Sequence, residues 1–105
     1  KERIFTLAEL KQYDGSDPNK PIYLGCAGWV HDVTAGKAFY GPGGAYGVFA
    51  GRDASRGLAL MEVAYTHADI SDLTLSQKQT LQEWSSKYAK YPVVGRIVDY
   101  SEPNS

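Results

Sequence analysis

Residues 39–51 read FYGPGGAYGVFAG, an uncharged segment with five glycines, one proline and four aromatic residues. Glycine at this density costs conformational entropy on folding, whereas aromatic side chains gain stability when they pack. Two interpretations of the rings follow from the residues alone. Either they pack in the core of the domain, or they line a pocket for a flat apolar ligand, which glycine allows the backbone to approach closely.

The length and composition limit the classes of protein to consider. The 105 residues suit one domain over residues 1–105, with a core at about 4–98 and a tail at 99–105. The net charge of −1 provides no basic surface for a polyanion, so we expect no nucleic-acid partner. The single cysteine, Cys26, excludes an intramolecular disulfide. No apolar run reaches the ~20 residues that a membrane span needs, although an anchor upstream in a parent protein stays open.

Two capping boxes predict the starts of two helices, Thr6 with Glu9 and Thr74 with Gln77. The first helix is short, and Asp14-Gly15 ends it. The second helix is the clearest in the chain.

The helix that follows Thr74 carries Leu81, Trp84 and Tyr88 on one face. Pro92 marks its end, because proline cannot continue a helix. The residues after it, VVGRIVDY, suit a final strand over 93–100.

The segment PIYLGCAGWVHDVT, residues 21–34, predicts a β-hairpin that turns at Ala27-Gly28. A further helix is expected over 51–61, with Asp53 or Ser55 as its N-cap. Helices and strands that are mixed without regular alternation indicate an α+β fold.

Motifs for phosphate binding and catalysis are missing from the sequence. A G-x-G-x-x-G loop that starts at Gly41 needs glycine at position 46, where the chain has Tyr46. No serine lies in a G-x-S-x-G setting. His31 and His67 lack zinc-site spacing, and we expect the first to be partly exposed on a strand and the second to lie on the surface. We therefore expect that the protein is not an enzyme.

The segment at residues 22–59, IYLGCAGWVHDVTAGKAFYGPGGAYGVFAGRDASRGLA, resembles the cytochrome b5-like haem/steroid-binding domain of the membrane-associated progesterone receptor family. Later elements of the same pattern are SDLT, LQEW and KYPVVG, so the resemblance covers about residues 4–98. It implies a cytochrome b5-like α+β fold, in which a small mixed sheet and helices form a haem pocket.

The resemblance also implies haem b as the cofactor. Cytochrome b5 has a His-Pro-Gly-Gly ligand motif, and the matching residues 41–44 read Gly-Pro-Gly-Gly and lack the histidine. The family instead uses the tyrosine carried here by Tyr46 as the axial ligand of ferric iron. Its haem-contacting residues match Tyr40, Lys90 and Tyr91.

Four other residues have an expected role. Asp53 matches a family aspartate linked to haem retention, but we favour a helix-cap role for it. His67 lies in the general region of the second haem ligand of cytochrome b5, and its role as a sixth ligand stays open. Phe39 and Phe49 are expected to anchor the glycine-rich segment in the core.

The function that the resemblance implies is binding or delivery of haem b, or modulation of cytochromes P-450 and sterol metabolism. The alternative is a haem-independent steroid- or sterol-binding or adaptor module that uses the same cleft. Expected partners are haem, cytochromes P-450 and a steroid ligand, with a parent protein at the endoplasmic reticulum membrane. A homodimer formed through haem stays open.

Overall fold

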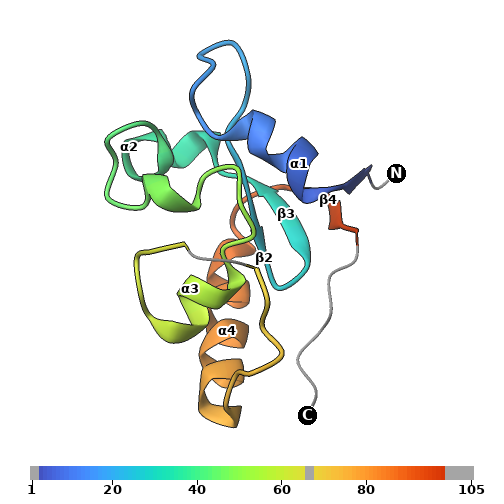
Figure 1. Ribbon diagram of the computed structural model, residues 1–105. Helices are drawn as coiled ribbons and strands as arrows, with labels where there is room; N and C mark the ends of the chain where they lie inside the picture. The colour runs from blue at the N-terminus through green and yellow to red at the C-terminus, as the bar shows by residue number, and fades with distance from the viewer. Residues whose placement is uncertain (1–2, 66–67, 99–105) are drawn as a thin grey trace.

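A four-stranded mixed sheet lies at the centre of the structure (Figure 1). The computed structural model describes residues 3–65 and 68–98. The strand order is β1-β4-β3-β2, with β1 parallel to β4 and the other neighbours antiparallel. The bounds are β1 Arg3–Phe5, β2 Tyr23–Cys26, β3 Trp29–Asp32 and β4 Val93–Ile97. The last strand therefore lies between the first strand and the hairpin of β2 and β3.

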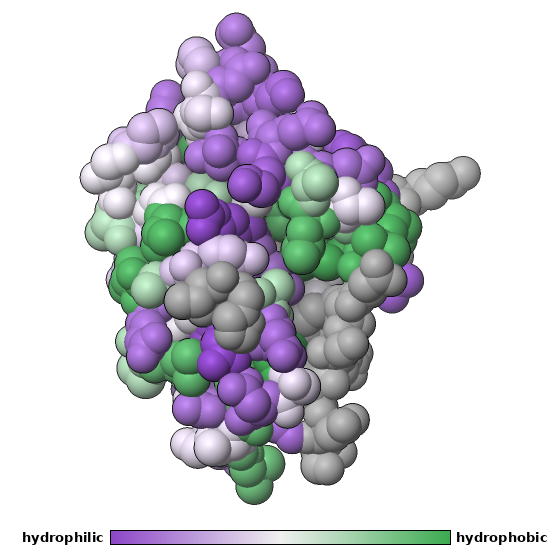
Figure 2. Space-filling view, in the orientation of Figure 1, coloured by the Kyte–Doolittle hydropathy of each residue, from purple (hydrophilic) through white to green (hydrophobic). Residues whose placement is uncertain are grey.

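Most of the helices are short. Their bounds are α1 Leu7–Leu10, η1 Lys11–Tyr13, η2 Thr34–Gly36, α2 Lys37–Tyr40, η3 Gly47–Phe49, α3 Ser55–Leu60 and α4 Leu75–Tyr88, where η marks 3-10 helices. Helices α3 and α4 lie side by side next to β2 (Figure 1). The loop between η1 and β2 forms the hydrophilic tip at the top of the view (Figure 2). These elements confirm the expected α+β class, with a small mixed sheet and helices packed against it.

The predicted hairpin is present and turns where the sequence indicates. Ala27 has a φ of 54° and Gly28 a φ of 88°, the left-handed pair that a tight two-residue hairpin turn requires. The N–H of Ala27 donates to Oγ of Ser55 over 2.8 Å. That hydrogen bond attaches the hairpin turn to the start of α3.

Each face of the sheet packs against a separate apolar cluster. Leu24 and Cys26 of β2 belong to the larger cluster, with residues from α2, α3, α4 and the glycine-rich segment. Val30 of β3 belongs to the smaller cluster on the other face. Phe5 and Leu10 lie fully buried in that smaller cluster. The larger cluster is the one that supports the candidate site.

The start of the chain differs from the prediction. The capping box of Thr6 and Glu9 is present and α1 follows it, but strand β1 before it was not predicted. Three residues are too few to show a strand pattern, and β1 is defined by its pairing with β4 near the other end of the chain.

The cap predicted for α3 is wrong. The N-cap is Ala54, which makes no side-chain capping hydrogen bond. Asp53 lies one residue earlier, where its carboxylate accepts from the N–H of Ser55 over 3.1 Å, and the Ser55 hydroxyl is used by the hairpin turn. Neither candidate therefore serves as the N-cap: Asp53 is buried one residue before it, and the Ser55 hydroxyl bonds to the hairpin turn.

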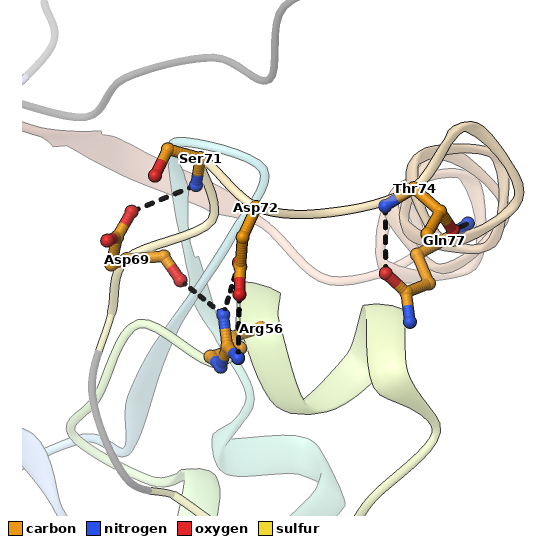
Figure 3. Close-up of polar contacts among 6 residues, drawn as sticks. All are labelled: Arg56, Asp69, Ser71, Asp72, Thr74 and Gln77. Carbon is orange, nitrogen blue, oxygen red and sulfur yellow. Dashed lines mark hydrogen bonds and ion pairs between the residues drawn. The ribbon is translucent and has the colours of Figure 1, made fainter.

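An arginine fork holds the turn before α4 against α3 (Figure 3). Nη1 of Arg56 donates to the backbone oxygen of Asp69 over 2.9 Å and to the carboxylate of Asp72 over 2.6 Å. Nη2 adds a bond of 3.2 Å to the second oxygen of Asp72. Two parallel bonds define the geometry of an arginine–carboxylate pair better than one, so the fork orients the turn at residues 69–72 relative to α3.

Replacement of Thr74 by alanine tests the second capping box. The Thr74 hydroxyl accepts from the N–H of Gln77 over 3.1 Å, and the Gln77 side chain accepts from the N–H of Thr74 over 2.9 Å. We expect Thr74→Ala to lower the free energy of unfolding by about 1 kcal/mol in urea denaturation. Ser86→Ala, at an exposed position of the same helix, should change it by less than ~0.5 kcal/mol. Equal losses in the two variants would contradict the capping role.

Candidate functional site

Four tyrosines from separate parts of the chain form a connected cluster, which we call the tyrosine cluster: Tyr40, Tyr46, Tyr88 and Tyr91. The Tyr40 ring lies at its centre, with centroid distances of 6.0 Å to Tyr46 and 6.2 Å to both Tyr88 and Tyr91. These spacings are within the range in which aromatic pairs attract. The end of α2, the glycine-rich segment and the end of α4 therefore meet at one place.

A buried hydrogen bond joins two members of this cluster. The hydroxyl groups of Tyr40 and Tyr88 are 2.8 Å apart, and both residues are more than 90% buried. Burial raises the pKa of both phenols above the usual value, and for Tyr88 the bond to Tyr40 raises it further. Both groups are therefore neutral at physiological pH, where they can share one hydrogen bond.

A pocket of about 360 Å³ opens beside this pair, and we call it the aromatic pocket. Its lining residues are Tyr40, Trp84, Lys87, Tyr88, Lys90 and Tyr91. The volume lies in the range of small-molecule sites, which combine apolar walls with a few polar groups. Three of the four sequence-predicted contact residues, Tyr40, Lys90 and Tyr91, are thus brought together.

Tyr46, the fourth predicted residue, lies beside the aromatic pocket and is not one of its lining residues. It is half-buried, and its ring lies 6.0 Å from that of Tyr40. On its other side the ring is nearly parallel to that of Phe49, at a centroid distance of 6.4 Å and an angle of 7°. The partly exposed phenol of Tyr46 is thus next to Tyr40, which forms part of the pocket wall.

The glycines let the segment fold back on α2. A Cβ on Gly44 would collide with the backbone carbonyl of Phe39, so glycine is required there. The same carbonyl accepts the N–H of Tyr46 over 2.8 Å, which places that residue. Of the two expected anchors, Phe49 is buried, as predicted, but Phe39 is 55% exposed and the prediction for it is wrong. Phe39 lies on α2 next to Tyr40, which takes the buried position of that helix, while Phe49 of η3 packs in the larger cluster.

His31 lies behind the pocket and is only 3% exposed, contrary to the prediction of a partly exposed histidine. Its Nδ1 is 3.2 Å from the backbone oxygen of Tyr91, and its ring centroid is 5.8 Å from that of Tyr88. Burial lowers the pKa of His31 below its usual value. The other histidine, His67, lies outside the described residues.

Asp53 lies away from the aromatic pocket. It is 3% exposed and borders a second cavity of about 210 Å³ together with Leu7, Lys11 and Tyr65. Burial raises the pKa of its carboxyl group. Neither cavity shares a lining residue with the other, so Asp53 makes no direct contribution to the aromatic pocket.

Three pocket residues were not among the sequence-predicted site residues: Trp84, Lys87 and Tyr88. A signal for two of them existed, because Trp84 and Tyr88 were assigned to the apolar face of the last helix. That face was interpreted as core. The end of α4 becomes a pocket wall only because Tyr40, from a distant part of the chain, packs opposite it. Lys87 carried no signal, since a lysine in the last turn of a helix is common.

The donor atoms near the pocket are phenol oxygens and amines. Within residues 3–65 and 68–98, no three His, Cys, Asp or Glu side chains are grouped as a metal site would require. Cys26 is buried, and burial raises the pKa of its thiol to about 12. A phenol oxygen is therefore the donor near the pocket that suits a ferric ion, which prefers hard anionic ligands.

The mixed sheet and the aromatic pocket define a cytochrome b5-like domain, and residues 6–98 match the family described as Cytochrome b5-like Heme/Steroid binding domain. A solved Arabidopsis thaliana structure described as having a cytochrome b5-like fold superposes with a TM-score of 0.84. It is 48% identical and the match covers 93% of each chain. The chain belongs to this haem/steroid-binding family, in its branch of membrane-associated progesterone receptor proteins.

Two curated relatives show how the chain relates to whole proteins. Probable steroid-binding protein 3 of Arabidopsis thaliana is 50% identical over 99 residues, which are 90% of this chain and 97% of the relative. Membrane-associated progesterone receptor component 2 of Homo sapiens is 46% identical over 111 aligned positions, which cover all of this chain and 49% of the relative. The chain thus spans nearly all of one relative and about half of the other.

The names of these relatives refer to steroid binding and to a receptor component, not to an enzyme. The human relative is named as membrane-associated. Among the helices described in this chain, none has the length and apolar character needed to cross a bilayer.

The burial of His31 predicts a dependence of stability on pH. Because the pKa is lowered in the folded state, the unfolded chain takes up a proton first as the pH falls below about 6.5. His31 therefore contributes stability above that pH, and the contribution is lost as the pH falls toward the folded pKa. Tyr88, whose ring lies against that of His31, stays neutral in this range because burial raises the pKa of its phenol.

Urea denaturation between about pH 7 and pH 5 checks this expectation. The free energy of unfolding should fall more steeply with decreasing pH in the unmodified chain than in His31→Gln. Other titrating groups are the same in both proteins, so the difference isolates His31. Parallel curves would show that protonation of His31 is not linked to folding.

Proposed function

We propose that the domain binds haem b at the aromatic pocket, with the phenolate of Tyr46 as the axial ligand of ferric iron. The observation that carries this proposal is the position of Tyr46, whose half-buried ring lies 6.0 Å from the Tyr40 ring of the pocket wall. The residues present fit the group: the walls are aromatic, and an oxygen donor lies beside them. The family description, which includes haem, supports the same proposal.

Each residue of the site has a separate task in this proposal. Tyr46 would provide an anionic phenolate oxygen, a recognised type of ligand for haem iron. Tyr40 presents a ring whose orientation is set by its hydrogen bond to Tyr88. Lys90 and Tyr91 line the pocket, where they would contact the periphery of the bound group.

The ligand type points to a role in binding or delivery. Bound haem supplies an iron centre that an anionic oxygen ligand stabilises in the ferric state. A tyrosine on one side, in place of a histidine pair, is poorly suited to rapid electron exchange. We therefore favour haem binding, haem delivery or modulation of cytochromes P-450 over catalysis by the domain itself.

The cellular setting is part of the proposal. The human relative is named as membrane-associated, which supports a parent protein held at a membrane, and the family resemblance suggests the endoplasmic reticulum. Cytochromes P-450 as partners and a homodimer formed through haem rest on that resemblance as well.

A second candidate function is haem-independent binding of a steroid or sterol. The name of the Arabidopsis relative refers to steroid binding, and the walls contributed by Tyr40, Trp84 and Tyr88 suit the flat apolar body of such a ligand. This candidate needs no phenolate from Tyr46. The two functions are therefore separated by what happens when the Tyr46 oxygen is removed.

Replacement of Tyr46 by phenylalanine tests the haem proposal. The substitution keeps the ring and removes the oxygen, so we expect affinity for haemin to fall at least ~10-fold, with the Soret band shifted. Tyr13→Phe is a matched control, because its ring stacks on Tyr23 in the smaller cluster on the other face of the sheet. Tyr91→Phe should weaken binding less than Tyr46→Phe.

Denaturation curves of the three variants accompany the titrations and show whether each is folded. Haemin binding that is unchanged in folded Tyr46→Phe would overturn the ligand assignment. An unmodified domain that gives no Soret shift with equimolar haemin, yet binds progesterone, would favour the second candidate.

A further inference from the structure

Two lysines lie at the mouth of the aromatic pocket. Lys87 is in the last turn of α4 and Lys90 follows the end of that helix, and both are exposed lining residues of the pocket. We call Lys87 and Lys90 the lysine pair. Lys87 was not predicted as a site residue, and it has no role in the function proposed above.

Aromatic rings of the pocket hold both ammonium groups. Nζ of Lys87 lies 4.6 Å from the centroid of the Trp84 ring, and Nζ of Lys90 lies 5.3 Å from that of Tyr91. Contacts of this kind attract a cation to the face of a ring. They also limit the positions that the flexible side chains visit, which lowers the entropy lost when a ligand binds.

The charges of the lysine pair are not neutralised within the part of the chain that the structure describes. The ion pair found there joins Arg56 to Asp72, and neither Lys87 nor Lys90 has a carboxylate within ion-pair distance. Two neighbouring cations without a counter-ion create a positive potential that attracts an anion. The domain as a whole has a net charge of −1, so this positive region is local.

A structural explanation covers only part of this arrangement. A cation in the last turn of a helix is favoured by the partial negative charge of the helix C-terminus, which would account for Lys87. It does not account for a second cation at Lys90, nor for the placement of both at the mouth of one aromatic pocket. The pocket geometry supplies the additional reason.

We propose that Lys87, together with Lys90, makes the aromatic pocket selective for flat apolar ligands that carry a carboxylate. This inference rests on the proposed function for the location of the ligand and adds the ligand's chemical class. The carboxylate of such a ligand accepts charge-assisted hydrogen bonds from the ammonium groups while its ring system lies against the aromatic walls. A neutral ligand of the same shape obtains only the second of these contributions.

The propionate groups of haem and the side-chain carboxylate of a steroid acid both provide this chemistry. Neutral sterols do not. Selection by Lys87 therefore discriminates between charged and neutral members of each ligand class, and the experiment compares each acid with its own ester.

The test uses haemin and its dimethyl ester, which have the same ring and iron but differ in peripheral charge. Both are titrated against the unmodified domain, Lys87→Met and Lys78→Met, with the Soret band as the readout. Lys78→Met is the matched control, because it removes the same charge from the same helix at a position that does not line the pocket.

The unmodified domain should bind haemin more tightly than the ester. Lys87→Met should weaken haemin binding about 2- to 5-fold, the range expected for an exposed ion pair, and leave ester binding unchanged. Lys78→Met should leave both affinities unchanged. The preference for haemin should also shrink as the salt concentration rises, because the interacting charges are exposed.

Equal weakening of acid and ester by Lys87→Met, or an equal effect of Lys78→Met, would overturn the selectivity. The result is separable from failure of the haem proposal, in which the unmodified domain gives no Soret shift with either ligand. In that event a flat steroid acid, 3-oxo-4-androstene-17β-carboxylic acid, and its methyl ester are titrated with tryptophan fluorescence as the readout, since Trp84 lines the pocket. A preference for the acid that Lys87→Met removes supports the inference, and no preference overturns it.

Discussion

The buried hydrogen bond between the hydroxyl groups of Tyr40 and Tyr88 connects the two segments that build the pocket. Tyr40 ends α2, directly before the glycine-rich segment, and Tyr88 ends α4. A buried hydroxyl left without a partner costs about 1–3 kcal/mol, so each ring holds the other in place. The aromatic pocket therefore depends on packing between distant parts of the chain and not on one loop.

The glycine-rich segment has a specific task within this arrangement. Because Gly44 has no Cβ, the segment can return to the carbonyl of Phe39, and the N–H of Tyr46 then bonds to that carbonyl. This return brings the Tyr46 ring next to Tyr40. The high glycine content and the aromatic rings thus serve one purpose, which is to place a partly exposed phenol beside an aromatic wall.

The sheet supports the pocket from behind and places its rim. His31 of β3 lies behind Tyr88 and contacts the backbone of Tyr91, while Lys90 and Tyr91 occupy the short connection between α4 and β4. The position of that connection is set by β4, which pairs with both β1 and β3. The pocket lining at the end of α4 therefore depends on the sheet for its position but contributes no strand to it.

The sequence by itself determined the features whose causes lie within a few residues: both capping boxes, the hairpin turn at Ala27-Gly28 and the apolar face of α4. It also indicated the family and three residues that line the pocket. Only the tertiary structure decided that β1 is a strand, that Phe39 faces solvent while Phe49 is buried, and that Lys87 borders the pocket. Capping and turn signals depend on local hydrogen bonds, whereas pairing and burial depend on which distant segments arrive opposite a residue.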